Sequence, residues 1–158
     1  MTNSDKRLFL IDAYAMIFRG YYALIRSPRL TSSGKDTSAI FGFTNSLIEL
    51  IRREKPTHLA VVFDVGQASV RTADFAEYKA NRNETPEAIK IAIPYIHKIL
   101  EAMHVPCLGL EGYEADDVIG TIACKAEKEG YQTFMVTPDK DFAQLVTPNI
   151  KIYKPGLK

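Results

Sequence analysis

The residues best suited to chemistry in this 158-residue sequence are carboxylates. Glu114, Asp116 and Asp117 fall within four positions, where an amphipathic helical pattern begins. Acids in a first helical turn favour the helix by facing the positive end of its dipole, at ~0.3–1 kcal/mol each. Three acids this close also repel one another. On this segment alone, a helix-capping role and a chemical role both stay open.

Further acids follow short apolar runs that predict buried strands. They are Asp12 after 8–11, Asp64 after 58–63, and Asp139 with Asp141 after 133–136. A single aspartate after a strand is commonly a turn or cap residue. Parallel strands, however, bring their carboxyl ends to one edge of a sheet, so all seven acids are expected to gather in one crevice.

The order of the elements predicts the fold. Besides the three apolar runs, a weaker strand is expected at 105–110 and an edge strand at 149–153. Helices are expected at 13–24, 38–55, 85–103 and 114–129, with a short one at 141–146. Thr85 is the expected cap of the third long helix, with Pro86 in its first turn. Alternating strands and helices of this kind predict one α/β domain over 1–158, with a mostly parallel central sheet and helices on both faces.

Seven carboxylates at one edge would be unstable without a counter-charge, because like charges disfavour ionisation of their neighbours. Oxygen ligands without a histidine or cysteine cluster favour Mg²⁺ or Mn²⁺ over zinc. Such ions commonly bind substrate phosphate, and two of them ~3.5–4 Å apart activate water and stabilise the leaving oxygen. The acids therefore indicate phosphodiester chemistry.

The segment 65–84 supplies positive charge and aromatic rings. Lys79 and Arg82, three residues apart, are expected to share a helical face and reach one phosphate, with Tyr78 beside them to stack on a base and Arg71 nearby. A solvated helix with incidental ion pairs is the alternative. The segment has few apolar anchors, so we expect it to be mobile when no ligand is bound.

Composition limits the class of protein. Hydrophobic residues make up 46% of the chain and charged residues 25%, as in globular domains, with a net charge of +1. No apolar run approaches ~20 residues, and the first residues do not form a secretory signal. Cys107 and Cys124 lack metal-ligand spacing and are expected to be buried thiols in a reducing cytoplasm.

The motifs together resemble the 5′ nuclease family, and most closely the N-terminal 5′→3′ exonuclease domain of bacterial DNA polymerases I. The resemblance runs from about Leu8 to Tyr153. It rests on these segments in this order: LID at 10–12 before a Tyr- and Arg-bearing helix, VFD at 62–64, YKANR at 78–82, GYEADD at 112–117 and PDKDFAQL at 138–145.

The resemblance implies a role for each matching residue. The seven acids would hold the metals: two ions in a complete site, and one ion expected in this chain. Lys79 and Arg82 would belong to a helical arch and contact the scissile phosphate, and Arg19 and Tyr21 match positions near the substrate's 5′ end. The implied reaction is hydrolysis of flapped or nicked DNA near a 5′ end during replication and repair.

One departure from the family affects the expected activity. The family continues with a further aspartate pair in a GDxxDN context and a helix-hairpin-helix-like element, and this sequence has neither. The chain is therefore expected to be the front portion of a longer DNA polymerase that binds metal but cleaves weakly or not at all.

Three other functions are compatible with acids at strand ends. A PIN-type ribonuclease shares that arrangement but usually lacks a basic arch. A signalling receiver domain also collects aspartates and binds Mg²⁺, but has no use for an EADD motif at a late helix. A non-catalytic DNA-binding module would be repelled by its own acids unless a metal intervened.

Overall fold

The computed structural model describes residues 5–65 and 85–155. In chain order the elements are strand β1 (Arg7–Asp12), helices α1 (Ala13–Ala23) and α2 (Ser38–Glu54), strand β2 (His58–Val62), helix α5 (Glu87–Ala102), strand β3 (Cys107–Leu108), helix α6 (Ala115–Lys128), strand β4 (Gln132–Val136), the 3₁₀-helix η2 (Lys140–Leu145) and strand β5 (Ile150–Tyr153). Every element expected from the sequence outside 65–84 is present, and the weak strand at 105–110 is reduced to two residues. Across the described residues, no helix is long and apolar enough to span a bilayer.

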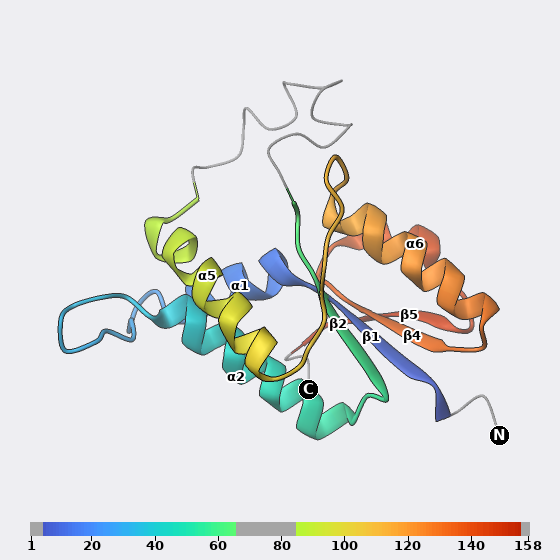
Figure 1. The fold of residues 1–158 in the computed structure, drawn as a ribbon, viewed down its shortest axis with the longest axis horizontal. Coiled ribbons are helices and arrows are strands. Elements are labelled where there is room, and N and C mark those ends of the chain that lie inside the picture. The colour runs from blue at the N-terminus through green and yellow to red at the C-terminus, as the bar shows by residue number, and fades with distance from the viewer. Residues whose placement is uncertain (1–4, 66–84, 156–158) are drawn as a thin grey trace.

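The five strands form one sheet in the order β3-β2-β1-β4-β5. All four pairings are parallel, so the carboxyl ends of the strands lie along one edge (Figure 1). β1 is central and pairs with β2 on one side and β4 on the other. The parallel sheet predicted from the sequence is confirmed, and so is the position of β5 at an edge.

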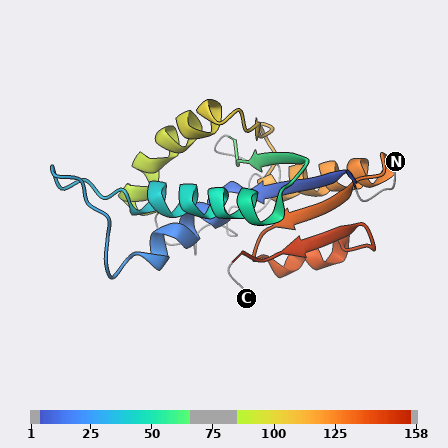
Figure 2. The ribbon, with the colours of Figure 1, turned by 90° about the horizontal axis from the view of Figure 1, so that it is seen from below.

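Helices cover both faces of the sheet, as expected, because the buried strands are apolar on both sides (Figure 1, Figure 2). Phe9 and Ile11 of β1 face a core shared with α1, α2 and α5. Leu10, between them, faces a second core shared with α6 and η2. The alternation along β1 therefore fixes which helices lie on which face, and it leaves α6 and η2 together beside the carboxyl edge.

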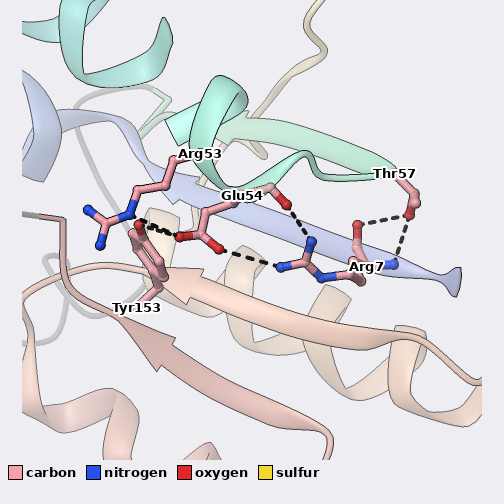
Figure 3. Close-up of polar contacts among 5 residues, drawn as sticks. All are labelled: Arg7, Arg53, Glu54, Thr57 and Tyr153. Carbon is pink, nitrogen blue, oxygen red and sulfur yellow. Dashed lines mark hydrogen bonds and ion pairs between the residues drawn. The ribbon is translucent and has the colours of Figure 1, made fainter. Parts of the chain in front are cut away.

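A polar contact network fastens the end of α2 to the strands (Figure 3). The Glu54 carboxylate accepts a hydrogen bond from the Tyr153 hydroxyl at 3.0 Å and pairs with Arg7 at 3.5 Å. Arg7 also donates to the Glu54 carbonyl, and its guanidinium lies 5.4 Å from the Phe9 ring centroid. The Glu54 side chain thus connects α2 with β1 and with the edge strand β5.

The expected cap of α5 is wrong. Pro86, not Thr85, is the N-cap residue, and its side chain makes no capping hydrogen bond. Pro86 has an extended ψ of 141°, and its carbonyl accepts from the backbone N–H groups of Ile89 and Lys90. The proline therefore precedes the helix instead of lying within its first turn.

The expected burial of both cysteines is also wrong, because Cys107 and Cys124 are exposed free thiols. Cys107 lies on the edge strand β3, which has a neighbour on one side only. Cys124 follows the buried Ala123 on α6 and lies on the side of the helix that faces away from the core. The side chains of successive helical residues differ by ~100° in direction. Cys124 is therefore exposed although the adjacent Ala123 is buried, and its apolar residue type alone did not determine its burial.

Candidate metal centre

The acids that follow the strands lie at the same edge of the sheet. Asp12 ends β1, Asp64 comes two residues after β2, and Asp139 comes three residues after β4. The register pairs Asp12 with Val62 and Ile11 with Val136, so the three strand ends lie side by side. Parallel pairing therefore gathers residues from positions 12, 64 and 139 of the sequence.

The amino end of α6 completes the acidic edge. Glu114 is the N-cap, and it forms a capping box in which the Asp117 carboxylate accepts from the Glu114 N–H at 3.2 Å. The Asp117 N–H donates to Asp116 at 2.9 Å. The helix-capping role considered from the sequence is thus present, and it orients these acids instead of excluding a chemical role.

A hydrogen bond joins α6 to the end of β2. The N–H of Ala115, in the first turn of α6, donates to the Asp64 carboxylate at 2.6 Å. A first-turn N–H has no partner within its helix, so an acceptor from another element stabilises it. Asp64 therefore fixes the start of the acidic helix against the sheet.

Three of the acids already lie at a spacing suited to a cation. One carboxylate oxygen from each of Glu114, Asp116 and Asp117 lies within 4.8 Å of the others, and all three residues are half-buried. Divalent Mg²⁺ and Mn²⁺ take oxygen ligands at ~2 Å, so oxygens this far apart fit around one ion with small side-chain adjustments. Each residue of the cluster offers a carboxylate oxygen as its ligand atom.

Asp12 carries the clearest electrostatic perturbation at this edge. Burial raises its pKa from 3.8 to about 6, and the charges of Asp64 and Asp116 add to that rise. Hydrogen bonds from the Ala15 N–H and the Thr137 hydroxyl, each at 3.4 Å, oppose it. The same Ala15 contact caps α1. The ionised form of Asp12 is therefore disfavoured in the metal-free protein, and a nearby cation would favour it.

Asp139 and Asp141 lie in one groove with the cluster on α6. The groove has a volume of about 950 Å³ between α6 and η2, and it is lined by Glu114, Asp116 and Asp117 as well as by these two aspartates. Asp139 caps η2 by accepting from the Asp141 N–H at 2.9 Å. Asp12 and Asp64 are not among the described residues that line the groove; Asp64 contacts its acidic end through the Ala115 N–H, and Asp12 interacts electrostatically with Asp116.

Sequence reasoning missed two features of the site. Thr137 is 1% exposed, donates to Asp12 and accepts from the Asp139 N–H at 3.2 Å, so it connects two acids. Its position directly after a buried strand was the available signal. Lys125, Lys128 and Lys140 also line the groove, and the helical spacing of the first two from Thr121 on α6 was visible in the sequence.

The other candidate residues are placed differently. Arg19 is exposed on α1 and lines a separate cavity of about 210 Å³ with Lys154. Tyr21 is half-buried, and its ring packs edge-on against that of Tyr22 at 5.1 Å between centroids. Most of the expected arch, with its candidate residues Arg71, Tyr78, Lys79 and Arg82, lies outside the described residues.

Comparisons with known proteins agree with this geometry. Residues 7–158 match the family model of the 5′-3′ exonuclease N-terminal resolvase-like domain. A 5′-3′ exonuclease of Aquifex aeolicus is 40% identical over 150 residues, which are 95% of this chain and 51% of that protein. DNA polymerase I of Bacillus caldotenax is 38% identical over 148 residues, 93% of this chain and 16% of the polymerase.

Solved structures share the fold. The T5 D15 protein, co-crystallised with metal ions, superposes with a TM-score of 0.68 at 18% identity, covering 94% of this chain and 55% of that one. The bacteriophage T5 flap endonuclease, as a variant in a pseudo-enzyme-product complex with DNA and metal ions, gives 0.64 at 17% identity, covering 94% of this chain and 54% of that one. This chain thus spans about half of the nucleases that it matches and a small part of the polymerases. By the family match and the sequence identities, the chain belongs to the family of 5′-3′ exonuclease N-terminal, resolvase-like domains.

Proposed function

We propose that this chain forms the metal-dependent catalytic centre of a 5′→3′ exonuclease and 5′-flap endonuclease that hydrolyses phosphodiester bonds in DNA. The observation that carries the proposal is the set of Glu114, Asp116 and Asp117 oxygens within 4.8 Å of one another, beside Asp12 and Asp64. Family membership supports it, because relatives of this domain are 5′-3′ exonucleases and DNA polymerases I.

The metal in this proposal is Mg²⁺ or Mn²⁺. Glu114, Asp116 and Asp117 would hold this ion together with Asp12 and Asp64. Asp139 and Asp141 would contribute ligands to the site of a second ion. Bound in this set, a divalent ion supplies Lewis-acid stabilisation of a phosphoryl oxygen and lowers the pKa of bound water. The donors fit such an ion because all are carboxylates, the type of ligand that hard cations prefer.

The chain's own residues position that site. Asp64 holds the start of α6 through the Ala115 N–H, which keeps the α6 acids at a fixed distance from β2. Thr137 donates to Asp12 and so orients one of its oxygens toward β4. Disturbing either contact is therefore expected to weaken metal binding, and replacing Thr137 would do so without removing a ligand.

The substrate in this proposal is DNA with a 5′ end, a flap or a nick, in replication and repair. The basic and aromatic residues assigned to contact it are Arg19, Tyr21, Arg71, Tyr78, Lys79 and Arg82, with Lys79, Arg82 and Arg19 at the reacting phosphate. The remainder of a DNA polymerase I polypeptide is the expected covalent partner, since relatives at about 40% identity are polymerases of that kind. The two free thiols support a reducing, cytoplasmic location.

A cleavage assay tests the proposal. A 5′-flap duplex is incubated with the protein and Mn²⁺, with parallel reactions in EDTA, with the Asp116→Asn variant and with an RNA strand of the same sequence. We expect at most weak Mn²⁺-dependent cleavage at the flap junction, lost in Asp116→Asn, and Mn²⁺ binding by calorimetry that weakens at least ~10-fold in the variant. Preferential cutting of the RNA would instead support a PIN-type ribonuclease. Absence of both Mn²⁺ binding and cleavage would overturn the proposal.

A further inference from the structure

Three exposed apolar residues lie close in sequence to the acids of the site. Val65 follows Asp64 and is 43% exposed, and Tyr113 precedes Glu114 and is 48% exposed. Leu110, three residues before Tyr113, is 56% exposed. We call Val65, Leu110 and Tyr113 the apolar lip. Contiguous exposed apolar patches rimmed by polar residues mark interaction sites, whereas single exposed apolar residues are ordinary.

The two segments that carry the apolar lip run side by side. The Phe63 N–H donates to the Leu108 carbonyl at 2.8 Å, continuing the β2–β3 pairing beyond the strands. Gly109 packs so closely on Val65 that a Cβ atom there would lie 2.2 Å from a Val65 methyl group. The lip is therefore built from two packed segments at the carboxyl edge of the sheet, and not from one isolated loop.

A tight turn sets the position of Tyr113. The Tyr113 N–H donates to the Leu110 carbonyl at 3.1 Å, and Gly112, within the turn, has a φ of +84°. Glycine adopts that conformation without strain, whereas other residues rarely do. The turn ends at the N-cap of α6, so Tyr113 immediately precedes Glu114, a residue of the acidic cluster.

Tyr113 differs from the other described tyrosines because its ring has no stacking partner. Tyr14, Tyr21, Tyr22, Tyr95, Tyr131 and Tyr153 each have an aromatic or cationic neighbour at the ring. Within residues 5–65 and 85–155, the ring of Tyr113 has no such neighbour, and its hydroxyl makes no hydrogen bond. Among the described residues, no aromatic or cationic side chain therefore occupies the faces of the Tyr113 ring.

We propose that Tyr113, supported by Leu110 and Val65, stacks on an unpaired nucleobase of the DNA strand whose phosphate lies at the acidic cluster. The inference rests on the proposed function. A base and its own phosphate belong to one nucleotide, so a ring one residue from Glu114 lies within reach of a base attached at that site. Stacking on an aromatic ring tolerates every base, which suits a nuclease that recognises structure and not sequence.

A structural role for Tyr113 gives a different expectation. An apolar residue immediately before an N-cap often packs against the fourth helical residue, here Val118, and this contact fixes the entry to the helix. Leucine retains such a contact and lacks an aromatic face, whereas phenylalanine retains both. The pair Tyr113→Leu and Tyr113→Phe therefore separates stacking from helix stabilisation.

The test measures binding of a 5′-flap duplex that carries 2-aminopurine as its first unpaired base, with Ca²⁺ present. We expect quenching of the 2-aminopurine fluorescence by wild type and Tyr113→Phe. Affinity should fall roughly 5- to 150-fold in Tyr113→Leu and Tyr113→Ala, with an unchanged slope of log Kd against log salt because no phosphate contact is lost. The control Tyr95→Ala, on α5 and similarly exposed at 47%, should bind as wild type does.

Each outcome decides the inference. Quenching and affinity that are equal in wild type and Tyr113→Leu would overturn stacking while leaving the proposed function intact. A different result is that Tyr113→Leu binds the flap more weakly and also has a lower melting temperature and weaker Mn²⁺ binding. That result would assign Tyr113 a structural role and would also overturn stacking. Failure of the wild-type protein to bind either Mn²⁺ or the flap would overturn the proposed function, and the inference with it.

Discussion

Replacing Asp12 by asparagine should stabilise the metal-free protein at neutral pH. Burial and the neighbouring Asp64 and Asp116 charges raise the pKa of Asp12 from 3.8 to about 6. The native state therefore holds a proton on Asp12 at pH values where the unfolded chain has released it. As pH rises through this window, from about 4 to above 6, this residue lowers the free energy of unfolding progressively.

The size of the effect follows from the pKa. A rise from 3.8 to about 6 corresponds to roughly 3 kcal/mol of unfavourable free energy for the ionised carboxylate. Asparagine removes the charge, and its side-chain oxygen still accepts from the Ala15 N–H. Allowing for relaxation and solvent screening, we expect Asp12→Asn to gain about 1–3 kcal/mol at about pH 7.5 and almost nothing near pH 4.

Urea denaturation in EDTA at several pH values provides the measurement, and Glu49→Gln, an exposed acid on α2, is the control. The control should change stability by less than ~0.5 kcal/mol. Excess Mn²⁺ should reverse the order, because an ion that binds the native state of the wild type stabilises it by mass action. Equal or lower stability of Asp12→Asn at neutral pH in EDTA would refute the electrostatic reasoning.

Three further changes probe the fold and the groove. Gly42→Ala should lower stability by about 1–3 kcal/mol in a thermal melt, because its Cβ would meet the Gly20 backbone at 2.5–2.8 Å; an unchanged melting temperature would contradict that contact. Tyr153→Phe should cost about 0.5–1.5 kcal/mol by removing the hydrogen bond to Glu54, with Mn²⁺ binding unaltered, and a loss of Mn²⁺ binding would mean that this network extends to the site. Maleimide should modify the exposed Cys124 in the groove, and a bound 5′-flap duplex should slow that reaction; equal rates by peptide mass mapping would exclude DNA from the groove.

The sequence predicted the parts of this protein that depend on local pattern. Continuously apolar runs at 8–11, 58–63 and 133–136 indicated buried parallel strands, and the acids after them indicated a shared edge. The exact pairing could not be obtained this way, since strand order depends on packing between residues far apart in the chain. The two-residue length of β3 and the exposure of Cys124 likewise follow from neighbours that no local pattern contains.

The sequence predicted the acids of the candidate site but not the hydrogen bonds that connect them to other elements. A spacing such as Glu114-x-Asp116-Asp117 signals a cluster, yet it does not reveal that Asp64 accepts from the Ala115 N–H or that Thr137 contacts Asp12. Both contacts join elements more than 50 positions apart. The metal-ligand roles of the seven acids stay predictions until an ion is located.

The pairing of the central strand β1 with β4 has a consequence for synthesis of the protein. Arg7 pairs with Gln132, so the middle of the sheet joins two segments separated by most of the domain. While the ribosome is still making the chain before β4, Asp12 has neither its Thr137 neighbour nor a complete sheet edge. The complete acidic edge therefore cannot assemble from the nascent amino-terminal half, because it also needs residues of α6 and the segment after β4.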